Sequence, residues 1–275
     1  MCAVIDFGSS MRRLHLFEFC DMAWYPASWR AYTTDLNLFF AAQFHAFRPI
    51  VPRLKQVLEG LDGRDIIDLG SGSSGPLPSV QKQLETEEHY PVTITLTDKF
   101  PNLQALRGVA AASQGKVRYV ETSVDAMDVP AELTGFRTMF VAFHHFPPHA
   151  ARRILADAAR KGAGIGVFEY TEPSLVWFIT ILLLPLYLWL TVPFMRPWSW
   201  ERLLWTYVLP LPILCAMWDG FVSCLRTYSP AQLRQLTHSI ESQDYSWEIG
   251  KVRSFGACRI TYLFGYPAKA EPNVS

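Results

Sequence analysis

The chain has few charged side chains and no excess of either sign. Of its 275 residues, 25 are basic and 25 are acidic, which gives 18% charged residues and a net charge of zero. A typical soluble domain has about 25% charged residues. Because the chain offers no basic surface to phosphates, nucleic acid is excluded as a partner. Half of the residues are hydrophobic, and this excludes a disordered protein.

Cysteine is also scarce, and its spacing forms no recognisable site. The five cysteines contain no CxxC pair, so we expect reduced thiols and no zinc-finger site. The first ten residues lack the charged and apolar regions of a secretory signal. We therefore expect a cytoplasmic protein of one large domain or two small ones.

Apolar sequence is abundant, and it is concentrated in one stretch. Between residues 175 and 195, 17 of 21 residues are hydrophobic, and between 203 and 218, 13 of 16 are. Six of the nine tryptophans lie here, namely Trp177, Trp189, Trp198, Trp200, Trp205 and Trp218. Outside this stretch, the chain has the composition of an ordinary α/β protein.

Strands and helices alternate along the rest of the chain. Short apolar runs predict strands at residues 64–69, 92–97, 117–121, 138–143, 164–169, 245–252 and 259–264. Helices are predicted at residues 28–40, 51–61, 81–87, 102–112 and 150–161, with another beginning at Pro230. This alternation predicts a largely parallel sheet with helices on both faces, in which ligands bind at the carboxyl ends of the strands.

The turn after the first predicted strand is the strongest signal for a ligand. It runs from Asp68 to Gly75 and reads DLGSGSSG. Its glycines let the backbone turn sharply and approach a ligand closely. Alone, such a turn is weak evidence, because it serves a dinucleotide or merely makes a tight connection. This turn lacks the usual dinucleotide spacing.

Two acids follow, at the ends of the next two strands. A carboxylate at Asp98 can accept both hydroxyls of a ribose, and one at Asp125 can accept a hydrogen bond from an adenine amino group. Each acid alone is equally a helix cap or a turn residue. Together with Asp68, they place an acid at three consecutive strand ends, which indicates a ligand with ribose and adenine.

With these residues in this order, the chain resembles the class I S-adenosylmethionine-dependent methyltransferases. The resemblance covers residues 48–172 and 227–267. It implies an α/β fold with a Rossmann-like, doubly wound, mostly parallel seven-stranded sheet, into which the apolar stretch is inserted as a helical hairpin. Residues 1–47 are then an N-terminal helical cap, 173–226 the hydrophobic insert and 268–275 a tail. The family's commonest turn has glycine at the position of Ser74, whereas here Gly75 comes one residue later.

The resemblance also implies which residues hold the cofactor, S-adenosylmethionine. Gly70 and Gly72 would lie against its methionine part, and Asp68 would hold the loop or meet the amino-acid group. Asp98 would bind the ribose, and Asp125 the adenine. The complete implied set is Asp68, Gly70, Ser71, Gly72, Gly75, Asp98, Lys99, Asp125, Ala126 and Phe143.

Catalytic candidates follow the fourth and fifth strands. The resemblance places the loop with His144 and His145 near the methyl group, where a histidine can take a proton from a nucleophile. Loop packing is the alternative role of both histidines, because in-line methyl transfer can rely on positioning alone. Glu169 is expected to face the same cleft. Prolines separate His149 from this pair and disfavour a metal site, so we expect none.

The apolar stretch admits two interpretations. In one it is membrane-associated: it lies on the bilayer, or crosses it an even number of times with a turn at residues 196–202. In the other it is a soluble lid that encloses substrate or supports a homodimer. Both imply a lipophilic acceptor, since a polar metabolite needs no such apolar wall. The predicted substrate residues are Trp24, Tyr32, Glu172, Trp218 and Asp219.

The sequence thus predicts an S-adenosylmethionine-dependent methyltransferase that acts on a small hydrophobic molecule or a lipid. Two alternatives stay open. One is a non-catalytic, membrane-associated scaffold or sensor that binds the cofactor. The other is an aminopropyl-type transferase on the same fold.

Overall fold

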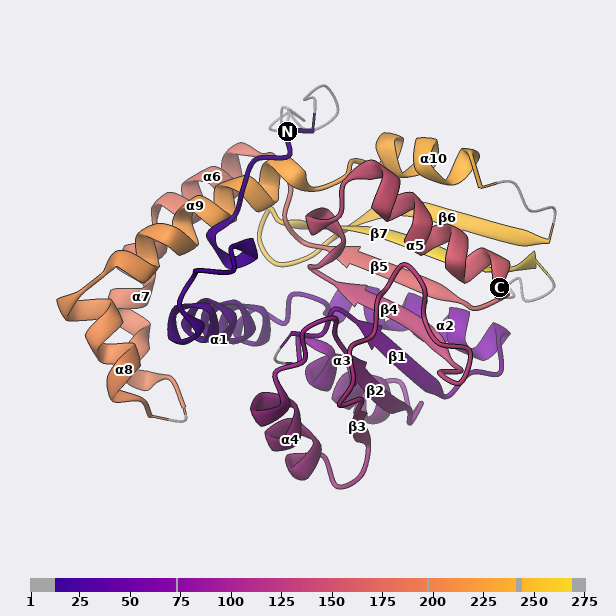
Figure 1. Cartoon of the computed structure of the whole chain (residues 1–275), viewed down its shortest axis with the longest axis horizontal. Helices are drawn as coiled ribbons and strands as arrows, with labels where there is room; N and C mark the ends of the chain where they lie inside the picture. The colour runs from indigo at the N-terminus through magenta and orange to yellow at the C-terminus, as the bar shows by residue number, and fades with distance from the viewer. Residues whose placement is uncertain (1–12, 73, 197, 241–243, 269–275) are drawn as a thin grey trace.

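A seven-stranded sheet forms the centre of the molecule (Figure 1). The computed structural model describes residues 13–72, 74–196, 198–240 and 244–268, and within them the strand order is β3-β2-β1-β4-β5-β7-β6. The strands are β1 (Asp65–Leu69), β2 (Thr93–Thr97), β3 (Val117–Tyr119), β4 (Phe136–Phe140), β5 (Ile165–Glu169), β6 (Tyr245–Arg253) and β7 (Arg259–Pro267). The first five are parallel, and β7 is antiparallel to both β5 and β6. The predicted mostly parallel, seven-stranded sheet is therefore confirmed.

Helices cover both faces of this sheet and form two apolar cores with it. One face is covered by α2 (Val51–Gly60), α3 (Leu77–Thr86) and α4 (Leu103–Ala112), and the other by α5 (Pro148–Arg160) and α10 (Pro230–His238). Side chains alternate along a strand, so Ile66 of β1 packs in the first core and Ile67 in the second. α10 begins at Pro230 as predicted, and Ser229 caps it with a capping box.

The fourth strand ends earlier than the sequence predicted. The apolar run extends to Phe143, but β4 ends at Phe140, and Val141 adopts a left-handed conformation with φ 51°. Phe143–His145 then form a 3₁₀ turn, labelled η4. Phe143 is fully buried and packs against Tyr228. Hydrophobicity misplaced this boundary because a buried turn is as apolar as a buried strand.

Residues 175–226 form an arm that extends beyond the sheet (Figure 1). α6 (Leu175–Leu182) and α7 (Leu184–Thr191) lead outward, and α8 (Trp200–Leu203) and α9 (Leu211–Arg226) lead back beside them. A 3₁₀ turn at Val192–Phe194 and a π-helical turn at Leu204–Val208 complete the arm.

Both halves of the arm are bent at prolines. The outgoing half bends by 49° before Pro185, and the returning half by 82° at Pro210 and Pro212. In the described part of the chain, no single helix is long and apolar enough to cross a membrane, although each bent pair reaches that length and composition together.

Residues 13–25, here called the strap, are the first described residues and are hydrogen-bonded to the arm. The Leu14 N–H donates to the Leu225 carbonyl at 3.0 Å. Farther along, the Phe19 and Cys20 N–H groups donate to the Asp219 carboxylate at 2.6 and 3.0 Å. The strap leads into α1 (Ala27–Gln43), which lies beside the arm in Figure 1.

Candidate active site

The glycine-rich turn between β1 and α3 presents curved backbone at the carboxyl end of the sheet. Gly70, Gly72 and Gly75 have φ angles of 71°, 56° and 57°, a left-handed region in which a Cβ is strained. A Cβ added to Gly72 would meet no atom within 4 Å, so space lies open above it. Ser74 also has a positive φ, 130°, at the position where glycine is commonest in the family turn.

Asp68 lies beneath this turn, with only 2% of its surface exposed. Its two carboxylate oxygens accept hydrogen bonds from the Thr138 and Ser71 hydroxyls, both at 2.7 Å. Burial raises the pKa of Asp68 to about 7, although these hydroxyls oppose the rise. These contacts are those of a residue that holds the loop, the first of its two expected roles.

Asp98, directly after β2, is hydrogen-bonded to both the loop that follows β1 and the loop that follows β2. Its Oδ2 accepts a hydrogen bond from the Gly72 N–H at 2.8 Å, and its Oδ1 accepts one from the Phe100 N–H at 2.7 Å. The carboxylate is partly exposed. Each of its oxygens can accept a second hydrogen bond, so ribose hydroxyls can bind to it without breaking the loop.

Lys99 and Asp125 join the ends of β2 and β3. The Lys99 ammonium lies 2.9 Å from Asp125 Oδ2, and the Met127 N–H donates to Asp125 Oδ1 at 2.9 Å. Burial raises the pKa of Asp125, but Met127 and Lys99 outweigh it and the pKa is lowered. Asp125 is therefore a charged acceptor beside the buried Ala126, at the edge where adenine is expected.

Phe100 lies at the same sheet edge and was not among the residues predicted from the sequence. Its ring is 83% exposed, two residues beyond Asp98 at the same sheet edge. An exposed aromatic ring has a face on which a purine base can stack. In the sequence, a large aromatic residue stands two positions after Asp98, in a loop rather than in a strand or helix that would bury it. That position could have indicated a stacking residue.

His144 and Glu169 form a buried pair where β4 and β5 end. The Glu169 Oε2 lies 2.9 Å from His144 Nδ1, and the Glu169 Oε1 accepts the His144 main-chain N–H at 3.1 Å. The two side chains are 2% and 5% exposed. A carboxylate at Nδ1 favours a proton on that nitrogen, which leaves Nε2 as a hydrogen-bond acceptor.

His145 belongs to a second cluster, which joins the loop to the strap. Its Nδ1 lies 3.0 Å from Asp21 and 3.5 Å from Glu18. Arg226 of α9 pairs with both acids, at 2.7 Å to Asp21 and 3.2 Å to Glu18. Burial raises the pKa of Glu18 to about 7 despite His145 and Arg226. For Asp21, burial raises the pKa, but hydrogen bonds to His145 and Arg226 outweigh it and lower the value.

Three of these side chains also have the chemistry of metal ligands. Glu18, His144 and His145 place one ligand atom each within 4.8 Å of one another. However, the Arg226 guanidinium lies 3.2 Å from Glu18 and 3.4 Å from His145. It thus supplies the positive charge that this acidic cluster needs, and a second cation at the same place would be repelled.

The predicted substrate residues do not gather at one place. Tyr32 is buried, and its hydroxyl pairs with Thr206 at 2.9 Å. Both Asp219 oxygens accept strap N–H groups, and the Trp218 indole donates to the Phe17 carbonyl at 3.0 Å. These three hold the arm against the N-terminal region. Trp24 is 68% exposed, although its ring packs edge-to-face against Phe19 and Tyr25.

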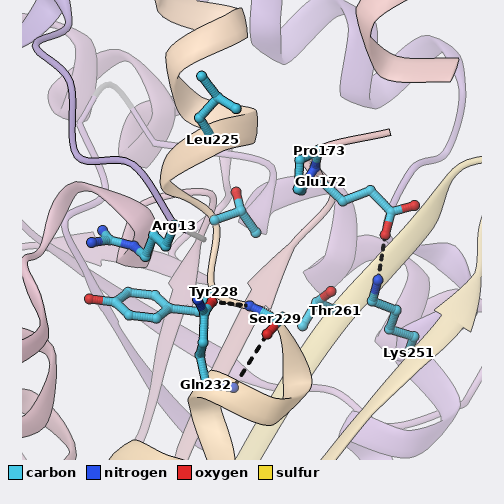
Figure 2. A pocket seen from close by; sticks show the side chains of 10 residues that line it. Arg13, Glu172, Pro173, Leu225, Tyr228, Ser229, Gln232, Lys251 and Thr261 are labelled. Atoms are coloured by element: carbon cyan, nitrogen blue, oxygen red, sulfur yellow. Dashed lines mark hydrogen bonds and ion pairs between the residues drawn. The ribbon is translucent and has the colours of Figure 1, made fainter. Parts of the chain in front are cut away.

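Glu172 lines a separate hollow, together with Arg13 of the strap (Figure 2). Its Oε2 pairs with Lys251 of β6 at 2.6 Å. The hollow has space for little more than a water molecule, and none of the glycine-rich turn lines it. Glu172 therefore lines a hollow outside the glycine-rich turn, and the buried ring of Phe143, which was predicted to contact the cofactor, is closed to a ligand.

Comparisons with known proteins find likeness in structure only. No protein-family model matches the sequence, and no curated protein is similar to it in sequence. PigF with SAH aligns at 14% identity and a TM-score of 0.48, over 88% of this chain and 62% of that chain. The pyocyanin biosynthetic protein PhzM aligns at 18% identity and a TM-score of 0.46, over 80% and 54%.

A third similar structure is NcsB1, an O-methyltransferase from neocarzinostatin biosynthesis in complex with S-adenosylmethionine and 2-hydroxy-5-methyl naphthoic acid. It aligns at 14% identity and a TM-score of 0.42, over 74% of this chain and 49% of that one. This chain spans about half the length of PhzM and NcsB1. Likenesses this distant carry no conclusion about activity, which must be argued from the residues themselves.

Proposed function

We propose that the protein is an S-adenosylmethionine-dependent methyltransferase that acts on a small hydrophobic molecule or a lipid. One observation carries the proposal. At the carboxyl edge of β1, β2 and β3, the Gly72 N–H donates to Asp98, the Val124 N–H donates to the Asp98 carbonyl, and Lys99 pairs with Asp125. This is the edge at which open parallel sheets bind nucleotide-like ligands.

The residues present fit that cofactor. Open space above Gly72 leaves room for the methionine part against the backbone. Asp98 has acceptor capacity for the ribose hydroxyls, Asp125 is a charged acceptor for the adenine amino group, and Phe100 has an exposed ring face for the base. When bound, the cofactor supplies an activated methyl group on sulfur.

The chain's own contribution to the transfer is to orient the acceptor and remove its proton. Glu169 keeps the proton of His144 on Nδ1, so that Nε2 can accept one from a hydroxyl, thiol or amine. His144 is buried beneath the strap. We therefore expect the acceptor to displace part of the strap as it binds.

The apolar arm supports a lipophilic acceptor and a location at a membrane. The arm begins at Leu175, close to Glu169 at the end of β5, and most of its exposed side chains are apolar. A polar acceptor would need matching polar groups along its path, and the arm has few.

A labelled-methyl transfer assay tests the function. The full chain is incubated with methyl-labelled S-adenosylmethionine and an extract of lipids and hydrophobic metabolites, beside the same protein with Asp98→Ala. We expect label in the organic phase with the wild type and at least tenfold less with the variant. If the wild type binds the cofactor but labels nothing, the sensor alternative replaces the enzyme.

A further inference from the structure

The outer half of the arm, residues 182–214, has an unusually apolar exterior, here called the distal surface. Its large apolar side chains are exposed along both the outgoing and the returning helices. Phe194 and Trp200 are each 77% exposed, and Trp198 between them is 51% exposed. Soluble proteins seldom expose large apolar side chains in such numbers, and where they do, the surface meets a partner.

Charge is nearly absent from the distal surface. Its charged residues are Arg196, Glu201 and Arg202. Arg202 is buried and pairs with Asp35 of α1 at 2.8 Å, so only Arg196 and Glu201 face outward. A partner that recognises charge would find little here, whereas an apolar phase would meet no large desolvation cost.

Two exposed aromatic residues of the arm have their polar atoms satisfied within it, whereas the buried Tyr187 hydroxyl and the buried Trp205 indole N–H have no hydrogen-bond partner among the described residues. The Trp198 indole N–H donates to the Pro193 carbonyl at 3.1 Å, and the Tyr207 hydroxyl donates to the Trp189 carbonyl at 2.5 Å. Pro185 and Pro212 lie in the first turns of α7 and α9, where a missing N–H leaves one fewer unsatisfied donor. Donors and acceptors that are satisfied within the protein lower the cost of entering lipid.

Only the outer half of the arm is available to a partner, because α9 continues into the body of the protein. Its inner half is fixed to the strap through Asp219 and Arg226. The bends of 49° and 82° also prevent either half from forming a straight span. Bent apolar helices that carry tryptophans and an arginine at their tip match the interfacial layer of a bilayer, where aromatic rings lie among the headgroups.

We propose that the distal surface inserts into the interfacial layer of a lipid bilayer, with Phe194, Trp198 and Trp200 at the point of entry and Arg196 among the phosphates. The inference that the distal surface contacts a bilayer depends only on its exposed apolar residues. The purpose of the contact, delivery of an apolar acceptor from the bilayer to His144, rests on the proposed function. A second copy of this chain is the other occupant that the experiment distinguishes.

Flotation of the full chain with phosphatidylcholine vesicles tests the contact. We expect the wild type to float with the vesicles, and 1 M NaCl to leave its bound fraction unchanged, because the contact is apolar. The double variant Phe194→Ser/Trp200→Ser should lower the bound fraction at least tenfold. The matched control, Phe100→Ser, removes an equally exposed ring from the sheet edge and should float like the wild type.

A second measurement needs no variant. Vesicles with bromine atoms on their acyl chains should quench the tryptophan fluorescence of the wild type, since the tip tryptophans would lie within reach of them. Absence of both flotation and quenching overturns the proposal, and so does a double variant that floats as well as the wild type. Sedimentation of a wild-type dimer that the double variant dissociates, without vesicle binding, would assign the surface to a second copy instead.

Calorimetric titration with S-adenosylmethionine keeps the two proposals apart. The double variant should bind the cofactor like the wild type, because its substitutions lie outside the sheet edge. A protein that floats but binds no cofactor contradicts the proposed function alone. A protein that transfers methyl groups but never meets vesicles contradicts the membrane contact alone.

Discussion

The Glu169 carboxylate holds His144 at two points, the ring Nδ1 at 2.9 Å and the main-chain N–H at 3.1 Å. One side chain at the end of β5 thus fixes both the backbone and the imidazole of the loop that follows β4. The same contact that positions the loop also selects the tautomer of the ring. Structure and proposed chemistry therefore depend on a single carboxylate.

Replacing Glu169 with Gln should separate cofactor binding from catalysis. An amide no longer fixes the proton on Nδ1, so we expect kcat for methyl transfer to fall by about 10²–10⁴, with unchanged S-adenosylmethionine affinity. Nitrogen NMR of His144 checks the tautomer, and Glu172→Gln, at the separate hollow, is the control. Equal kcat values for Glu169→Gln and the wild type would show that positioning alone suffices.

Asp98→Ala should weaken S-adenosylmethionine binding by about tenfold or more, since charge-assisted hydrogen bonds contribute about 1.5–3 kcal/mol. Isothermal calorimetry gives the affinity directly. Asp128→Ala is a suitable control, because Asp128 is an exposed loop acid whose side chain pairs with Lys161, outside the glycine-rich turn. An affinity that Asp98→Ala leaves unchanged would remove the ribose assignment.

Phe100→Ala should lower cofactor affinity without lowering stability. Stacking on a base contributes about 1–3 kcal/mol, which corresponds to roughly 5- to 150-fold in Kd. The ring is 83% exposed, so its removal leaves no cavity and the Tm should stay constant. Phe100→Tyr keeps the ring face and should restore binding; failure of that rescue would contradict stacking.

Arg226→Ala should destabilise the protein strongly. The Arg226 side chain is 4% exposed and pairs with Glu18 and Asp21, and breaking a buried pair costs about 3–5 kcal/mol. Urea unfolding measures the change, with Arg196→Ala on the exposed tip as the control. Limited proteolysis should also cut the strap faster in Arg226→Ala. A change as small as that of the control would mean that the cluster does not hold the strap.

Glu18→Gln should alter the pH dependence of stability. Burial raises the pKa of Glu18 from 4.5 to about 7, so the folded protein keeps a proton that the unfolded chain releases between these values. Stability therefore falls as the pH rises through this window. The difference in Tm between Glu18→Gln and the wild type should increase from pH 4.5 to 7 and stay constant at higher pH. The same difference for Glu132→Gln, at an exposed residue, is the control and should stay constant throughout.

Much of the fold was determined by the sequence itself. Strands such as β1 and β2 are short apolar runs, with Asp68 near the end of β1 and Asp98 directly after β2, and such runs are typical of the buried strands of a parallel sheet. The loops after parallel strands meet at one edge of the sheet. Because Asp68, Asp98 and Asp125 follow one another at the ends of three strands, the sequence predicted that they share this edge. Local sequence patterns were sufficient to predict these strands and acids, because each one is defined by a few consecutive residues.

Only the tertiary structure decided which polar groups remain available to a ligand. Tyr32 and Asp219 have the residue types of a substrate site, yet Thr206 and the strap N–H groups satisfy them. Glu18 meets Arg226, which lies far along the chain. A hydrogen bond between distant residues depends on how whole elements pack, and no local pattern contains that information.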